Sequence, residues 1–338
     1  MITMITMITM ITIAMLGLAA IVRGDDDLPY DPLLLGDLGD PGPDVAGMSL
    51  EIDVRDDVRS RTIPLRIWLP ADHLPAPVIL FSHGLGGSRD GNAWLGRHWS
   101  GRGYCVVFLQ HAGSDEAVWR DLPFPERLPS LKAAVNRATT LDRYKDLPVV
   151  IDRLGEWNSA QDGPLAGRFD LARIGIAGHS FGAVTAQGVT GQRTPAGQTP
   201  LSDPRIRAAV LMSPSVPDGC DAATAFGGVV IPWMILTGTD DESPIGNATA
   251  ASRLEIFPAL PPGGKYELVL ADGEHQAFGD RILPGSRRPR NPNHHRVVRA
   301  LSTAFFDAFL RDRAAAREWL EGDGPRGVLE QHDRWQFK

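Results

Sequence analysis

The chain has 338 residues, 43% of them apolar and 22% charged, and its formal net charge is −7. This composition is close to the average of globular proteins and is sufficient for a sizeable core. The acidic balance argues against a nucleic-acid-binding surface, which requires a basic patch. The two cysteines, Cys105 and Cys220, have no spacing pattern that predicts a disulfide framework or a metal site.

The N-terminal segment 1–24 differs from the rest of the chain. It consists of a three-residue repeat, MITMITMITMIT, followed by the apolar run IAMLGLAAIV. Such a run is typical of a signal peptide, although the positively charged region that should precede it is missing. We interpret the segment as an export signal or membrane anchor of a periplasmic or extracellular protein, or else as an artefact or misassigned start of a cytoplasmic one. Residues 25–44, which are acidic and rich in Pro and Gly, are expected to form an extended lead-in.

A regular pattern begins at about residue 49. The stretches 49–56 and 61–70 alternate apolar and polar residues, which predicts a pair of half-buried antiparallel strands. The stretches 76–84 and 104–111 are continuous apolar runs, which are typical of central parallel strands covered on both faces. Between these two runs, residues 90–103 are expected to form a short helix that ends at a glycine.

The second half of the chain continues this alternation. Four more strands are predicted, at 173–180, 205–214, 231–241 and 266–275. Helices are predicted between or after them, at 141–158, 181–190 and 294–313. Strands that alternate with helices predict a mostly parallel sheet with helices on both faces.

The stretch 111–140 is longer than a strand-to-helix connection needs. Long connections at the carboxyl ends of strands often carry binding sites, so we interpret it as a small cap or a wall of a substrate cleft. Its aromatic residues Trp119 and Phe124 are candidates for the wall of an acyl pocket, since ligand pockets are mostly apolar. The alternative is that both side chains only pack the insertion against the domain.

One short motif points to chemistry. Gly178-His179-Ser180-Phe181-Gly182 fits G-x-S-x-G, and it lies between a predicted strand and a predicted helix, which is the context that the motif requires. The turn raises the serine hydroxyl above the sheet, and side chains at Gly178 and Gly182 are expected to collide with neighbouring backbone. Ser180 is therefore the candidate nucleophile, and a tight turn with an idle serine is the alternative.

A serine hydroxyl needs a base, and the base needs an acid that orients it. In this motif's fold the chain order is Ser, acid, His. His275 follows a late apolar strand and is the candidate base, whereas His294 and His295 begin the last helix and are interpreted as surface or cap residues. The acid should follow a strand between Ser180 and His275. The candidates there are Asp240 and Asp241, with Asp218 as a weaker one.

An oxyanion hole needs two backbone N–H groups. One is expected from Phe181, the residue after the nucleophile. The other is expected from Leu85 in the glycine-rich loop FSHGLGG, residues 81–87, which follows an early central strand. Gly84 in the same loop is a candidate substrate contact, because a glycine lets backbone approach a ligand closely.

Four stretches together resemble a known family. They are ILFSHGLGGSRDGNAWLGRHWSGRGYCVVFLQHAGSDE, IGIAGHSFGAVT, MILTGTDDESPI and ADGEHQAF, which lie between about residues 78 and 279. The chain resembles the α/β-hydrolases, and within them serine esterases of the platelet-activating-factor acetylhydrolase and "predicted dienelactone hydrolase" kind. The resemblance implies an α/β-hydrolase domain at 45–315 with a C-terminal tail at 316–338, and a Ser–Asp–His carboxylic ester hydrolase without metal or organic cofactor.

The resemblance also bears on individual residues. In related hydrolases the acid commonly lies three residues beyond a strand-ending glycine; Gly238 occupies that place here, which favours Asp241 over Asp240. True dienelactone hydrolases use a cysteine where this chain has Ser180. The expected substrate is a small or polymeric ester, with a short or medium acyl chain. A lipase, a cutinase-like polyester hydrolase, an amidase, a thioesterase, an acyltransferase and a non-catalytic binding module are the alternatives, and membrane association through the N-terminal segment stays open.

Overall fold

The computed structural model describes residues 29–34, 48–199, 201–280, 286 and 288–338. The chain divides into two units, 1–30 and 31–338, and every described helix and strand lies in the second. The expected signal or anchor segment 1–24 and most of the expected lead-in 25–44 lie outside the described residues. None of the helices in the described ranges is both long enough and apolar enough to cross a bilayer.

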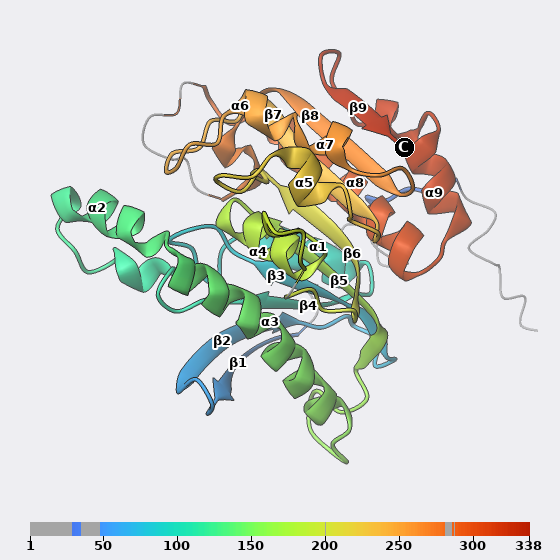
Figure 1. Cartoon of the computed structure of the whole chain (residues 1–338). Helices are drawn as coiled ribbons and strands as arrows, with labels where there is room; N and C mark the ends of the chain where they lie inside the picture. The colour runs from blue at the N-terminus through green and yellow to red at the C-terminus, as the bar shows by residue number, and fades with distance from the viewer. Residues whose placement is uncertain (1–28, 35–47, 200, 281–285, 287) are drawn as a thin grey trace, which may run out of the picture. The chain divides into compact units, whose positions relative to one another are not determined.

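A nine-stranded sheet forms the centre of this unit, with the strand order β1-β2-β4-β3-β5-β6-β7-β8-β9 (Figure 1). The strands are Ser49–Asp56 (β1), Arg61–Trp68 (β2), Ala76–Ser82 (β3), Cys105–Leu109 (β4), Phe169–His179 (β5), Ile206–Met212 (β6), Trp233–Asp240 (β7), Lys265–Glu274 (β8) and Arg334–Phe337 (β9). The six strands from β4 to β8 in this order pair in parallel. The pairs β1–β2, β2–β4 and β8–β9 are antiparallel. All eight predicted strands are thus confirmed, including the antiparallel start.

Burial explains why the central runs form strands. Every residue of β3 and of β4 is buried, as expected for continuous apolar runs in a sheet covered on both faces. By contrast, β1 alternates exposed with less exposed residues, in agreement with its position at the edge. Cys105 in β4 and Cys220 are free thiols.

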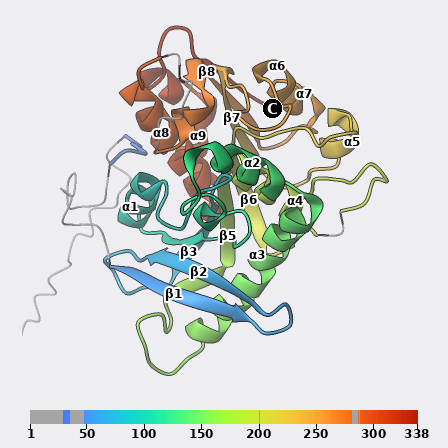
Figure 2. The same ribbon diagram turned by 90° about the vertical axis from the view of Figure 1, so that its left-hand side faces the viewer.

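Helices cover both faces of the sheet, and Figure 2 shows α1, α8 and α9 on one side and α3, α4 and α5 on the other. The α-helices are Ala93–Gly101 (α1), Phe124–Ala134 (α2), Arg137–Asn158 (α3), Phe181–Val189 (α4), Ala222–Phe226 (α5), Ala250–Arg253 (α6), Ile256–Ala259 (α7), Pro292–Leu310 (α8) and Ala314–Glu321 (α9). The sheet packs closely on α8, because a Cβ at Gly175 in β5 would touch the ring of Phe306. A mixed α/β architecture with a mostly parallel sheet is therefore confirmed.

The C-terminal residues 316–338 are not a tail outside the domain, so this expectation is wrong. They contain most of α9 and the strand β9, which pairs with β8 and completes one edge of the sheet. Trp335 stacks on Tyr266 with ring centroids 5.7 Å apart, and its Nε1 donates to the Leu320 carbonyl at 3.0 Å. The strand has four residues and only Trp335 among them is partly buried, which is too short a signal to recognise in sequence.

The insertion 111–140 contains a 3₁₀ turn, Glu116–Val118, the helix α2 and the first turn of α3. Only Ala134 of α2 is buried, and the helix stands away from the sheet in Figure 1. The helix α3 begins four residues before the predicted start, because Asn136 and Thr139 form a reciprocal capping box there. It continues through Pro148, as predicted.

Candidate active site

Three loops at the carboxyl edge of the parallel strands bring the candidate residues together. Ser180 follows β5, Asp241 follows β7, and His275 follows β8. Because these strands run in parallel, their carboxyl ends lie at the same edge of the sheet, where binding sites of such sheets form. This topology brings Ser180, Asp241 and His275, which are far apart in the sequence, into one spatial cluster.

The turn at Ser180 is strained and tightly packed. Ser180 has φ 56° and ψ −117°, a conformation that non-glycine residues adopt only when surrounding structure enforces it. A Cβ at Gly178 would overlap the Gly182 carbonyl, and one at Gly182 would overlap the Ser82 carbonyl. The expectation that side chains at both glycines would collide with backbone is confirmed. The Ser180 N–H donates to the Met212 carbonyl at 2.9 Å and fixes the turn against β6.

Ser180, His275 and Asp241 form one continuous hydrogen-bonded chain. Ser180 Oγ lies 2.8 Å from His275 Nε2, and His275 Nδ1 lies 2.7 Å from Asp241 Oδ1. With Asp241 ionised, Nδ1 carries the proton and donates to the carboxylate, so Nε2 is free to accept from the serine hydroxyl. The arrangement places a base on the candidate nucleophile and an anion behind the base.

The geometry separates the three candidate acids. Asp241 is fully buried, and its second oxygen accepts from Thr237 Oγ1 at 2.9 Å. Burial raises the pKa of Asp241, but the His275 hydrogen bond and the Arg253 charge outweigh it and lower that pKa to about 2. Asp240 points away and lies 3.3 Å from Arg288, and Asp218 is exposed. Of the three, only Asp241 contacts His275.

Arg253 was not predicted from the sequence, and it contacts both Asp241 and His275. This α6 side chain is 1% exposed, and its Nε lies 3.2 Å from Asp241 Oδ1 and donates to the Asp241 carbonyl at 3.0 Å. Its Nη2 lies 3.4 Å from His275 Nδ1. The Arg253 guanidinium also donates to the carbonyls of Ser213 and Pro214, so it fixes the Asp241 loop against the end of β6.

His179 in the elbow contacts the loop that carries the candidate base His275. Its Nε2 donates to the His275 carbonyl at 2.9 Å, and the two rings lie 4.9 Å apart. Burial and the neighbouring His275 lower the pKa of His179 to about 3, so the ring is neutral at neutral pH. A neutral donor here orients the His275 backbone without adding charge to the site.

The two candidate oxyanion donors lie on adjoining segments. Gly84 packs on the elbow, since a Cβ at this position would lie 3.5 Å from Ser180 Cβ. Phe181 is the first residue of α4, where an N–H group has no partner within the helix. Among the described residues, neither the Leu85 nor the Phe181 amide donates to another backbone group. Both amides are therefore available to a negatively charged oxygen.

Of the two aromatic candidates in the insertion, Trp119 contacts the glycine loop, whereas Phe124 is largely exposed. Trp119 Nε1 donates to the Gly86 carbonyl at 2.8 Å. A Cβ at Gly86 would meet this ring and Leu131 of α2, so both pack across the loop. Phe124 is 78% exposed, which gives it no place in an enclosed acyl pocket. These contacts agree with the packing interpretation for Trp119, and a role of either side chain in substrate binding stays a prediction.

A second hydrogen-bonded set of Ser, His and Asp lies beneath the glycine loop, and it was not predicted from the sequence. Ser82 Oγ lies 2.9 Å from His111 Nε2, and His111 Nδ1 lies 2.9 Å from Asp146 Oδ2. All three residues are fully buried. Two cations, Arg59 and Arg61, also bind Asp146, at 2.8 and 2.9 Å. His111 follows β4 as His275 follows β8, which is the one sequence signal that could have indicated it.

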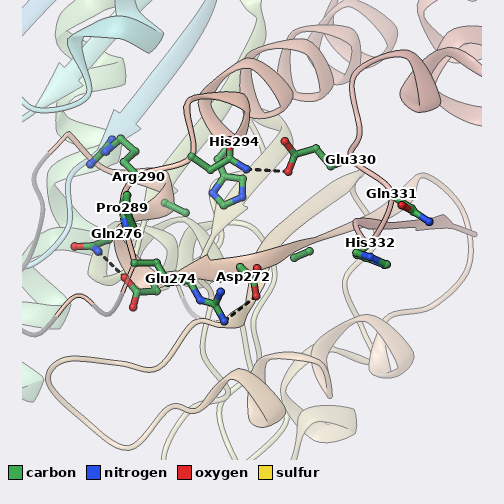
Figure 3. A pocket seen from close by; sticks show the side chains of 13 residues that line it. Asp272, Glu274, Gln276, Pro289, Arg290, His294, Glu330, Gln331 and His332 are labelled. Carbon is green, nitrogen blue, oxygen red and sulfur yellow. Dashed lines mark hydrogen bonds and ion pairs between the residues drawn. The ribbon is translucent and has the colours of Figure 1, made fainter.

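A cavity of about 410 Å³ lies on another side of the His275 loop (Figure 3). Glu274, Gln276, Arg290 and His294 are part of its lining, and Gln276 and Glu274 bond each other at 2.6 Å. Its described lining includes neither Ser180 nor Asp241. The expectation of a surface or cap position for the two histidines of α8 needs correction, since His294 is 4% exposed and the ring of His295 stacks on that of Trp94.

Comparisons with models of known families and with curated proteins find no match for this chain. In the parts of the chain that the structure describes, no group of His, Cys, Asp or Glu side chains is arranged to hold a metal ion.

Proposed function

We propose that the protein is an α/β-hydrolase-fold carboxylic ester hydrolase with Ser180 as its nucleophile. The observation that carries the proposal is the hydrogen-bonded chain from Ser180 through His275 to the buried Asp241, with the serine on a strained strand-to-helix turn. This turn between strand and helix is the context in which G-x-S-x-G acts as a nucleophile elbow. The half-buried Ser180 keeps its hydroxyl within reach of a substrate.

Acylation follows from these contacts. Ser180 Oγ attacks the ester carbonyl carbon while its proton moves to His275 Nε2, 2.8 Å away. The carbonyl oxygen becomes an oxyanion, which the amides of Leu85 and Phe181 stabilise together with the N-terminus of α4. The tetrahedral intermediate then expels the alcohol, which takes the proton from Nε2. Asp241 stays ionised and stabilises the imidazolium.

Deacylation repeats the steps with water. A water molecule attacks the acyl-enzyme carbonyl and gives a proton to His275 Nε2, and a second oxyanion forms between the same two amides. Its collapse releases the carboxylic acid, and the proton returns to Ser180 Oγ. The buried Asp241, with its pKa near 2, keeps its charge across the physiological pH range.

The proposed substrate is an ester with a short or medium acyl chain. Trp119 packs on the glycine loop, and Phe124, which is 78% exposed, encloses no space beside the insertion for a long acyl chain. A long acyl chain would gain little additional buried area there.

A panel of p-nitrophenyl esters from two to sixteen carbons tests the proposal. We expect turnover with all short esters and faster hydrolysis of the four-carbon than of the sixteen-carbon ester. A matched thioester and a matched anilide identify a thioesterase or an amidase, if either is hydrolysed faster than the ester. Absence of turnover on every member of the panel would contradict the proposed function, and a preference for sixteen carbons would contradict the acyl length alone.

A further inference from the structure

Arg143 is a buried cation beneath the candidate oxyanion hole, and the acylation steps do not use it. It lies on α3 and is 0% exposed. Burial of a guanidinium is unfavourable unless its donors are satisfied. In Arg143 each of the three nitrogens donates to the protein, and the acceptors belong to three different segments. The identity of these segments indicates what the residue does.

Two of the nitrogens hold the glycine loop. Nη2 donates to Ser82 Oγ at 3.0 Å and to the His83 carbonyl, directly before Gly84 and Leu85. Nη1 donates to Ser114 Oγ at 2.9 Å, and the Ser114 carbonyl accepts the Gly86 N–H at 2.9 Å. The loop that carries the Leu85 amide is therefore fixed on both sides of that residue.

The third nitrogen and the face of the guanidinium hold the other donor. Nε donates to Thr185 Oγ1 at 2.8 Å, and Thr185 Oγ1 donates to the Phe181 carbonyl at 2.9 Å. The Arg143 Cζ atom lies 4.5 Å from the centroid of the Phe181 ring, within range of a cation–π interaction. One side chain thus connects the two backbone segments whose amides face the substrate oxygen.

The charge of Arg143 is not paired directly. Among the described residues no carboxylate forms an ion pair with it, and Asp146, one turn along α3, is bound by Arg59, Arg61 and His111. Burial lowers the pKa of Arg143 to about 9, so the guanidinium is still charged at neutral pH. A positive charge in a low-dielectric interior favours negative charge nearby more strongly than it would in water.

We propose that Arg143 is the positioning residue of the oxyanion hole: it fixes the Leu85 and Phe181 amides relative to each other and adds a positive charge behind them. This inference rests on the proposed ester hydrolase function. The role predicts an effect on the transition state, where the oxyanion forms, rather than on binding of the neutral ester.

The test compares Arg143→Met and Arg143→Lys with Arg168→Met on p-nitrophenyl butyrate. Arg168 is the matched control, because it is also buried and bonds backbone carbonyls, those of Pro70 and Asp72, but it precedes β5 at the opposite end of that strand from Ser180. We expect kcat of Arg143→Met to fall about 100- to 1000-fold, as for loss of an oxyanion-hole donor, with KM changed less than about threefold. Arg143→Lys should recover part of the loss, and Arg168→Met should keep kcat within about threefold.

A boronic acid inhibitor supplies the second readout, because its adduct with a serine imitates the tetrahedral oxyanion. Its inhibition constant should weaken in parallel with kcat in Arg143→Met and stay constant in Arg168→Met. Folded Arg143→Met with unchanged kcat and unchanged inhibition would overturn the inference, whereas a wild type without turnover would overturn the proposed function. If Arg143→Met does not fold, Ser114→Ala is decisive: we expect kcat to fall about tenfold, and an unchanged kcat overturns the inference.

Discussion

The described residues contain two hydrogen-bonded Ser–His–Asp sets, and the two differ in their surroundings. In one, Ser180 contacts His275 at 2.8 Å and His275 contacts Asp241 at 2.7 Å. In the other, Ser82, His111 and Asp146 repeat the order with distances of 2.9 and 2.9 Å. The correct residue types at the correct distances therefore do not by themselves define a catalytic site.

The differences concern access and charge. Ser180 is half-buried on a turn with φ 56°, whereas Ser82 is fully buried at the end of β3. Arg143 donates to Ser82 Oγ at 3.0 Å, so a buried cation already binds this hydroxyl. Asp146 binds two arginines in addition to its histidine. We infer that the first set can react with a substrate, whereas the second holds strands and α3 together.

The largest expected effect on turnover distinguishes Ser180 from Ser82. Ser180→Ala should lower kcat on p-nitrophenyl butyrate by about a million-fold, as loss of a triad nucleophile does, without unfolding the protein. Ser82→Ala should leave the nucleophile and its base in place and change kcat by less than about tenfold. Turnover of both purified variants, with circular dichroism to verify folding, makes the comparison. A Ser180→Ala protein with a tenth of the wild-type activity would show that the nucleophile is elsewhere.

The next largest expected effect on turnover distinguishes Asp241 from its neighbour Asp240. Asp241→Asn should lower turnover by about ten-thousand-fold, because the His275 tautomer and its cation lose their anion. Asp240→Asn is the matched control and should lower turnover by less than about tenfold, since Asp240 faces Arg288 instead. The measurement is kcat of both variants on the same ester. The reverse ranking would assign the acid to Asp240, and two mild effects would direct attention to Asp218.

The elbow and His275 were predictable because each is a local signal, whereas the local pattern left Asp240 and Asp241 open and only the resemblance favoured Asp241. Continuous apolar runs gave the strands, and Ser180 and His275 follow such runs directly. Arg143 and Arg253 were not predictable, because their role depends on which side chains of a helix turn inward. Arg143 lies in LDRYKD, between Asp142 and Lys145, and nothing in that stretch distinguishes the one fully buried cation from its neighbours. Long-range packing alone selects it.

In the set formed by Ser82, His111 and Asp146, the aspartate should affect stability rather than turnover. Asp146→Asn removes the fully buried anion that Arg59 and Arg61 share and leaves them only the more exposed Asp142 in common, and loss of one partner of a buried pair costs about 3 kcal/mol or more. We expect the free energy of unfolding in urea to fall by about that amount, with residual activity far above that of Asp241→Asn. Equal stability of Asp146→Asn and wild type would contradict the structural role of this set.

The smallest effect is the pH dependence of stability that the buried histidines produce. Burial and the Arg143 charge lower the pKa of His111 to about 4, below the usual 6.5. The unfolded chain therefore takes up a proton below pH 6.5 that the folded chain does not accept until about pH 4. Stability from this residue is fully present above pH 6.5 and decreases by about 1.4 kcal/mol for each pH unit below it.

Urea unfolding at pH 7.5, 6.5 and 5.5 measures this term, and His111→Gln isolates it. The variant removes one titrating group, so its free energy of unfolding should fall less steeply between pH 6.5 and 5.5 than that of wild type, by about 1 kcal/mol, because the unfolded histidine is already half-protonated at pH 6.5. The absolute stability of the variant at pH 7.5 does not enter the comparison. Equal slopes in the two proteins would show that His111 is not held neutral by its surroundings.

Covalent labelling tests the central claim most directly. A fluorophosphonate reacts with an activated serine, whose Oγ displaces fluoride and forms a stable phosphonate ester. We expect intact-protein mass spectrometry to find one label on wild type and on Ser82→Ala, none on Ser180→Ala, and peptide mapping to place the label on Ser180. An unlabelled wild type, a label on Ser82, or a Ser180→Ala protein labelled as fast as wild type would contradict the assignment of Ser180 as the nucleophile.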